Sequence, residues 1–116
     1  MKAFKINTAT QQVEEIQINI WKDIAPAIGN GCRCFSIPVI FDNEDSIYCD
    51  DEGLFNTFEG GFMMKDWCYP IVGNSLLIGS DEEGEMVDVK TTKEELEKSI
   101  TWVSKKNAEA WADLYR

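Results

Sequence analysis

Segments in which apolar and polar residues alternate, separated by short polar turns, recur along most of the sequence. A period of two puts the apolar side chains on one face of a β-strand, and strands joined by short turns pair antiparallel. We therefore expect a mostly antiparallel sheet of about five strands or more. The expected strands are residues 1–7, 13–19 and 35–41, which show this spacing, and residues 46–50, 75–79 and 85–89, which lie between turns.

The segment 35–41 has the clearest alternation, and it carries a proline near its centre. The side chains that the alternation places toward the core are Phe35, Ile37, Val39 and Phe41. Pro38 has no N–H to donate to a neighbouring strand, so it predicts an edge position or a β-bulge.

Two helices are expected. The first, residues 20–28, ends at glycines and contains Pro26, which keeps it short or kinked. The second begins at a capping box formed by Thr92 and Glu95 and is predicted to be one long helix that continues to Tyr115, with a break near Asn107 as an alternative. Its apolar residues at helical spacing are Leu96, Ile100, Val103, Trp111 and Leu114.

The stretch 54–70 is apolar without a period, and its glycine pair, Gly60 and Gly61, predicts a loop that packs on the body of the protein. No repeat, linker or composition change divides the chain, so residues 1–116 are expected to form a single domain. The predicted fold class is α+β, a mostly antiparallel sheet with a short helix and a long C-terminal helix packed on it.

The charge is strongly acidic, with 21 acidic residues, 11 basic residues and no histidine, for a net charge of −10. Such a surface repels phosphate backbones, so we expect no direct nucleic-acid binding. No apolar run reaches the roughly 20 residues of a membrane helix, and the first residues lack a secretory signal. These features predict a cytoplasmic protein that does not bind membranes.

Four cysteines, Cys32, Cys34, Cys49 and Cys68, raise the question of a metal or redox site. A closed zinc site takes two pairs of ligands, each typically two to four residues apart. Here one pair is separated by a single residue, and the other two cysteines stand alone. We interpret all four as reduced, small apolar residues and expect no metal and no cofactor.

Acidic residues cluster in three turns. Two neighbouring turns hold Asp42, Glu44, Asp45, Asp50, Asp51 and Glu52, and another holds Asp81, Glu82, Glu83 and Glu85. The segment 42–53 does not have the spacing of a calcium loop. Two interpretations stay open, namely solvated hairpin tips or an acidic surface that binds a basic protein partner. The residues predicted to bind that partner are Asp50, Asp51, Glu52, Asp81, Glu82 and Glu83.

Large aromatic residues in a domain of this size usually lie in the core. The alternative is that some of them line a ligand pocket, in which case the segment from Phe62 to Pro70 is the expected wall. The residues concerned are Trp21, Trp67, Trp102 and Trp111, with Met63 and Met64.

Three pieces of the sequence, in their order, resemble a family of small bacterial domains of unknown function that phages, plasmids and other mobile elements carry. The pieces are "IAPAIGNG", "SIYCDDEGLF" and "YPIVGNSLLIGSDEEGE". Members of that family show a short helix ending in glycines, an acid-acid-glycine turn (here Asp51, Glu52 and Gly53) and a glycine-flanked apolar strand (here 71–79). The resemblance covers residues 20–89, implies a mobile-element protein and brings no catalytic residues. The C-terminal helix and the cysteines lie outside its pattern.

The function predicted from these features is that of a non-enzymatic, cytoplasmic protein of mobile-element type that acts by protein–protein interaction through an acidic surface. The alternative is a small-ligand-binding or enzymatic domain that uses acidic residues near the segment 62–70. A histidine-dependent nucleophile is excluded, because the chain contains no histidine. No catalytic residue is therefore assigned.

Overall fold

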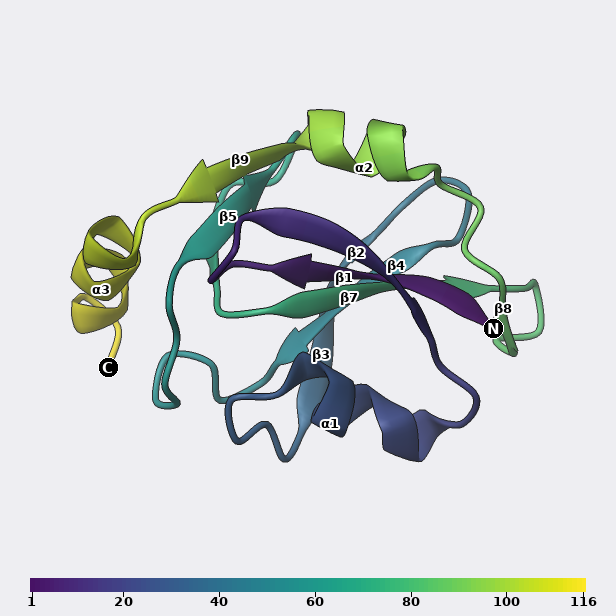
Figure 1. Ribbon diagram of the computed structural model, residues 1–116, viewed down its shortest axis with the longest axis horizontal. Coiled ribbons are helices and arrows are strands. Elements are labelled where there is room, and N and C mark those ends of the chain that lie inside the picture. The colour runs from purple at the N-terminus through teal and green to yellow at the C-terminus, as the bar shows by residue number, and fades with distance from the viewer.

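Nine strands, three short α-helices and one 3-10 turn make up the fold (Figure 1). The structure is a computed structural model and describes residues 1–116. The strands are β1 (Lys2–Asn7), β2 (Gln12–Gln17), β3 (Phe35–Ile40), β4 (Ser46–Asp50), β5 (Gly61–Met64), β6 (Ile71–Val72), β7 (Ser75–Ser80), β8 (Met86–Val87) and β9 (Ile100–Val103). The helical segments are η1 (Trp21–Asp23), α1 (Ile24–Ile28), α2 (Lys93–Ser99) and α3 (Lys105–Asp113). None of the helices is both long enough and apolar enough to cross a membrane.

The strands form two antiparallel sheets. The larger has the order β2-β1-β7-β4-β3, with β8 paired to the end of β7, and the smaller has the order β6-β5-β9. The central strand is β7, in which Leu77 pairs with Phe4 of β1 on one side and with Ile47 of β4 on the other. The expectation of an α+β fold with mostly antiparallel sheets is confirmed.

The larger sheet is covered on both faces, because β7 is apolar on both. Leu76 packs with Ile28 of α1 on one face. Leu77, on the opposite face, packs with Phe62 of β5 and Leu96 of α2. Figure 1 shows α1 on one side of the larger sheet and the smaller sheet with α2 on the other.

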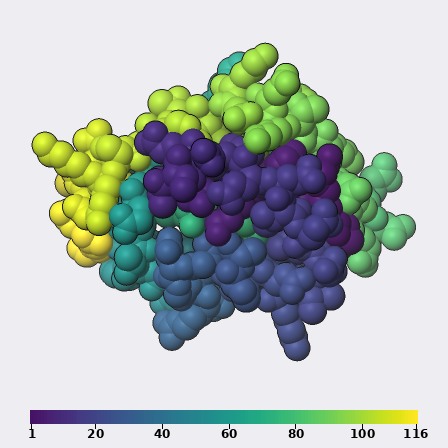
Figure 2. All heavy atoms as spheres, viewed as in Figure 1, coloured from purple at the N-terminus to yellow at the C-terminus, as the bar shows by residue number.

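The last helix, α3, packs through small residues on a third cluster. Ala108 and Ala112 are fully buried and contact Phe58 and Val72. Figure 2 shows this helix within the yellow lobe at one end of the molecule, whose longest dimension is 38 Å. This packing leaves Trp111, next to Ala112 in sequence, partly exposed at the edge of the smaller sheet.

The prediction of one long C-terminal helix is wrong. The capping box at its start is confirmed, because Thr92 Oγ1 accepts from Glu95 N at 3.1 Å and Thr92 N donates to Glu95 Oε1 at 3.2 Å. The helix nevertheless ends at Ser99, and the four residues of β9 pair with β5. Isoleucine, threonine, tryptophan and valine favour strands, and the edge of β5 gives them a partner. The chain becomes helical again at Ser104, whose side chain caps α3.

The stretch 54–70 is also more regular than the sequence predicts, because part of it is strand β5. The glycine pair does not mark a turn. A Cβ atom at Gly61 would lie 2.6 Å from the carbonyl oxygen of Ile71, closer than any real Cβ contact. Glycine is required there because β5 and β6 pair at this point.

Strand β3 has the edge position and the bulge that Pro38 predicts, and the bulge falls between Ser36 and Val39. It also overturns the expectation that alternate residues share one face. Val39 packs against the cluster under the smaller sheet, Phe35 packs against the cluster under α1, and Ile37 is 43% exposed. An inserted residue reverses the side-chain alternation of the rest of the strand.

Candidate functional site

An aromatic row follows the edge of the smaller sheet. After β5 the chain turns at Asp66, where φ is +65°, and returns to β6 through Trp67 and Tyr69. The ring of Tyr69 lies 6.3 Å from that of Trp67 and 6.0 Å from that of Trp111 on α3, centroid to centroid. Trp111 in turn lies 4.7 Å from Tyr115. Four rings from two separate segments therefore succeed one another at the surface.

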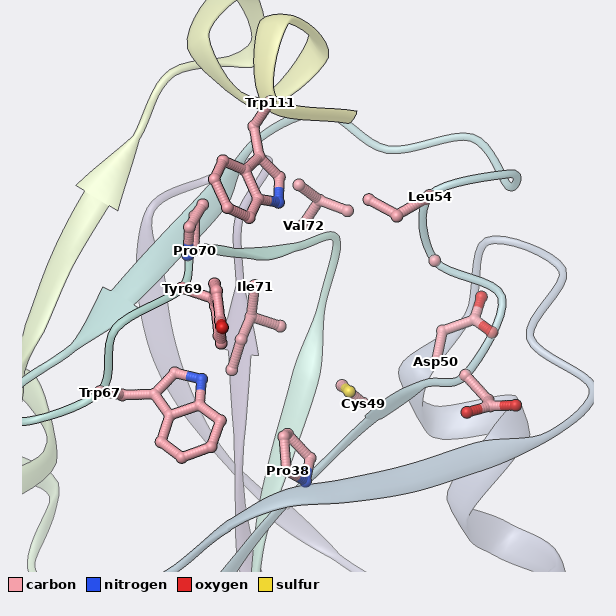
Figure 3. A pocket seen from close by; sticks show the side chains of 12 residues that line it. Pro38, Cys49, Asp50, Leu54, Trp67, Tyr69, Pro70, Ile71, Val72 and Trp111 are labelled. Carbon is pink, nitrogen blue, oxygen red and sulfur yellow. The ribbon is translucent and has the colours of Figure 1, made fainter. Parts of the chain in front are cut away.

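A cavity of about 240 Å³ lies between this row and strands β3 and β4, and we call it the aromatic groove. In Figure 3 the rings of Trp67, Tyr69 and Trp111 form one wall, and Asp50 and Cys49 lie opposite them. The groove is lined by Pro38, Cys49, Asp50, Asp51, Gly53, Leu54, Trp67, Tyr69, Pro70, Ile71, Val72 and Trp111. No lysine or arginine is among these residues.

A second hollow continues the groove along β3. It shares Pro38 and Trp67 with the first and extends between residues 38–42 and 64–67. Its charged residues are Asp42, Lys65 and Asp66. The groove and this hollow together run along the edge strand of the larger sheet.

The acidic end of the groove is made by the turn after β4. Asp50 shapes this turn, because its Oδ1 accepts from Glu52 N at 2.9 Å and its Oδ2 accepts from Asn56 Nδ2 at 2.7 Å. Glu52 forms an exposed ion pair with Arg33 at 3.2 Å. Neither Asp50 nor Asp51 takes part in any of the three ion pairs of the protein, so both carboxylates at the groove are uncompensated, and Asp51 is the exposed one.

The other predicted partner-binding residues, Asp81, Glu82 and Glu83, lie elsewhere. Strands β4 and β7 are antiparallel, so the turn after β7 lies at the end of β4 remote from Asp50. There Asp81 Oδ1 accepts from Glu83 N and Glu85 N, both at 2.9 Å. The six residues therefore form two separate patches, and only the patch of Asp50, Asp51 and Glu52 borders the groove.

Asp45 is buried, in contrast to the interpretation of the acidic turns as solvated. Its exposed fraction is 0%. Its carboxylate accepts from Thr91 Oγ1 at 2.6 Å, from Thr91 N at 2.7 Å and from Lys90 N at 3.0 Å. It thus joins the turn before β4 to the segment that leads into α2. Its role is structural.

The four thiols are free. Cys32 Sγ lies 3.4 Å from the carbonyl oxygen of Cys34, and Cys49 Sγ lies 3.4 Å from Ser36 Oγ. Burial, together with the negative charge of Asp50, raises the pKa of Cys32 to about 11, and burial raises the pKa of Cys49 as well. A raised pKa lowers the thiolate fraction at neutral pH, which disfavours nucleophilic and metal-binding roles. No three cysteine or carboxylate side chains converge as a metal site would require.

Of the four tryptophans, only Trp67 and Trp111 border the groove. Trp21 is 45% exposed and contacts Tyr48 on the α1 side of the larger sheet, and Trp102 packs partly on the core. The segment 62–70 does wall a cavity, through its second half. No pattern in the sequence predicts that α3 supplies the remaining aromatic wall, because that contact joins segments far apart in the chain.

A comparison of the chain with protein-family models, curated proteins and solved structures finds no match. The resemblance over residues 20–89 to domains of mobile elements stays a prediction. The site is therefore interpreted from its own geometry.

Proposed function

We propose that this protein is a non-enzymatic, cytoplasmic interaction module that binds a basic segment of a partner protein in the aromatic groove. One observation carries the proposal. An open apolar groove has three aromatic rings on one wall and the uncompensated carboxylate of Asp51 at its end, with no cation among its lining residues.

The two parts of the groove supply different contributions to binding. Aromatic side chains offer a large contact area with few rotatable bonds, so they lose little entropy when a partner binds. A carboxylate at the rim attracts a lysine or arginine, and the net charge of −10 raises the association rate of any basic partner. This combination favours a basic polypeptide over an acidic or neutral one.

The arrangement of the carboxylates supports binding over catalysis. General acid–base chemistry with two carboxylates needs both groups available to the substrate. At the groove each oxygen of Asp50 accepts a hydrogen bond that holds the turn, so the exposed Asp51 is the carboxylate that is freer to meet a ligand. The mobile-element origin stays a prediction that rests on the resemblance alone.

The test measures the dissociation constant of a short arginine-rich peptide by fluorescence anisotropy across a salt series. Asp51→Lys should weaken binding by about tenfold, because it removes an attraction and adds a repulsion at the groove. Glu83→Lys is the matched control, since it makes the same charge change at an exposed residue of the other acidic patch. Equal losses in the two variants would show that only net charge matters and would overturn the proposed site.

A further inference from the structure

The aromatic row offers a continuous line of rings to an extended bound chain. Trp67, Tyr69 and Trp111 follow one another at 6.3 Å and 6.0 Å. A polyproline II helix is extended, with three residues per turn and a rise of about 3.1 Å per residue, so about four of its residues span the three rings. It also has no internal hydrogen bonds, which leaves its carbonyl groups available to donors from the groove.

The tryptophans present such donors. In Figure 3 the indole nitrogens of Trp67 and Trp111 lie on the ring edges that face the cavity. An indole N–H only donates, and backbone carbonyls are its natural acceptors in a bound peptide. Flat aromatic walls with donors at their edges suit proline-containing segments, which dock in aromatic-lined grooves.

The edge strand beside the groove disfavours the rival mode of peptide binding, in which the peptide adds a strand to a sheet. Strand β3 is interrupted by a bulge between Ser36 and Val39, and Pro38 within it has no N–H to donate. Strand addition requires a row of regularly spaced backbone donors and acceptors. Binding of side chains in the groove does not require such a row.

We propose that the partner segment is an extended, proline-containing chain with an arginine or lysine at one end, its prolines lying against the aromatic row and its cation meeting Asp51. This rests on the proposed function and goes beyond it, because it names the conformation and the polarity of the ligand.

The experiment compares three peptides by fluorescence anisotropy. They are a peptide with alternating prolines and a terminal arginine, the same peptide with alanine at each proline, and the same peptide with glutamate at the arginine. The first should bind about tenfold more tightly than either of the others, because each change removes one of the two recognised features.

Two variants place the binding in the groove. Tyr69→Ala removes the middle ring, whose residue is 53% exposed, and should weaken the proline peptide by about tenfold. Trp21→Ala is the control, because Trp21 is a comparably exposed aromatic residue on the α1 side of the larger sheet. Its affinity should match that of the unaltered protein, and circular dichroism checks that both variants are folded.

The outcomes separate this inference from the proposed function. If the alanine peptide binds as tightly as the proline peptide and Asp51→Lys still weakens both, the groove binds basic segments and the inference is wrong. If no arginine-containing peptide binds, both are wrong. An equal effect of Tyr69→Ala and Trp21→Ala would also refute the inference.

Discussion

The buried carboxylate of Asp45 should contribute strongly to stability. Asp45→Asn keeps the shape of the side chain but replaces one of its two acceptor oxygens with a donor. The side chain is 0% exposed, and its oxygens accept from Thr91 N, Thr91 Oγ1 and Lys90 N. All three donors point at Oδ2, so the amide oxygen of asparagine keeps them only as weaker, uncharged hydrogen bonds, and the new NH₂ group in the place of Oδ1 is buried and faces Lys90 N.

The expected change in the free energy of unfolding follows from the energies of the hydrogen bonds at this site. A hydrogen bond to a charged group contributes about 1.5–3 kcal/mol, and a buried donor left unsatisfied costs about 1–3 kcal/mol. Asp45→Asn should therefore lower the free energy of unfolding by about 2–4 kcal/mol. This is a large part of the 5–15 kcal/mol or so that holds an ordinary domain folded.

Urea unfolding followed by circular dichroism measures this change as a lower midpoint at an unchanged slope. Asp42→Asn is the matched control, because Asp42 lies in the same turn and is exposed. It should alter stability by less than about 0.5 kcal/mol. If the two variants unfold at the same urea concentration, Asp45 does not join the turn to the α2 segment, and this part of the account fails.

Three further changes test the packing and the thiols. Leu96→Ala should lower the free energy of unfolding by about 2–5 kcal/mol in the same urea assay, because the side chain is fully buried in α2; a loss below about 1 kcal/mol would contradict the packing of α2. Gly61→Ala should leave little folded protein in a thermal melt, because its Cβ would lie 2.6 Å from the Ile71 carbonyl oxygen; an unchanged melt would refute the close pairing of β5 and β6. Cys32 should react with iodoacetamide at neutral pH more slowly than the exposed Cys34, because the pKa of Cys32 is raised to about 11. Mass spectrometry measures the two alkylation rates. The raised pKa favours the protonated thiol in the folded state, so the contribution of Cys32 to stability is present below about pH 8.5 and is lost as the pH rises through about 11. Equal alkylation rates would contradict the burial of Cys32.

Local signals in the sequence predicted local structure correctly. The capping box at Thr92 and Glu95 forms as expected, because it depends on residues three apart. Pro38 indicated both the edge position and the bulge of β3, because a missing N–H excludes a central place in a sheet. The short apolar runs within 46–50 and 75–79, bounded by turns, likewise predicted the paired strands β4 and β7.

The C-terminal half shows where periodicity misleads. Leu96 is buried as the helical spacing requires, whereas Leu114 on the same predicted line is 74% exposed. Ile100 and Val103 contact the protein from a strand and not from a helix. Over residues 96–103 the spacing of the apolar residues fits a helix and a strand equally well. The edge of β5, which decides for the strand, comes from a distant part of the chain.

The candidate site could be predicted only in part. The segment 62–70 was expected to wall a pocket if one existed, and Trp67 does so. The pairing of that segment with Trp111, and the separation of the two acidic turns, follow from the sheet order and from the packing of α3. Neither is encoded in residues that are neighbours in the sequence.

A ¹⁵N NMR titration with the proline–arginine peptide, read from the four tryptophan indole N–H signals, tests directly whether the aromatic groove is the binding site. We expect the signals of Trp67 and Trp111, which line the groove, to shift with saturation. Those of Trp21 and Trp102, which do not line it, should stay in place. A titration in which all four signals move alike, or in which Trp21 moves and Trp67 does not, would contradict the assignment of the aromatic groove as the binding site.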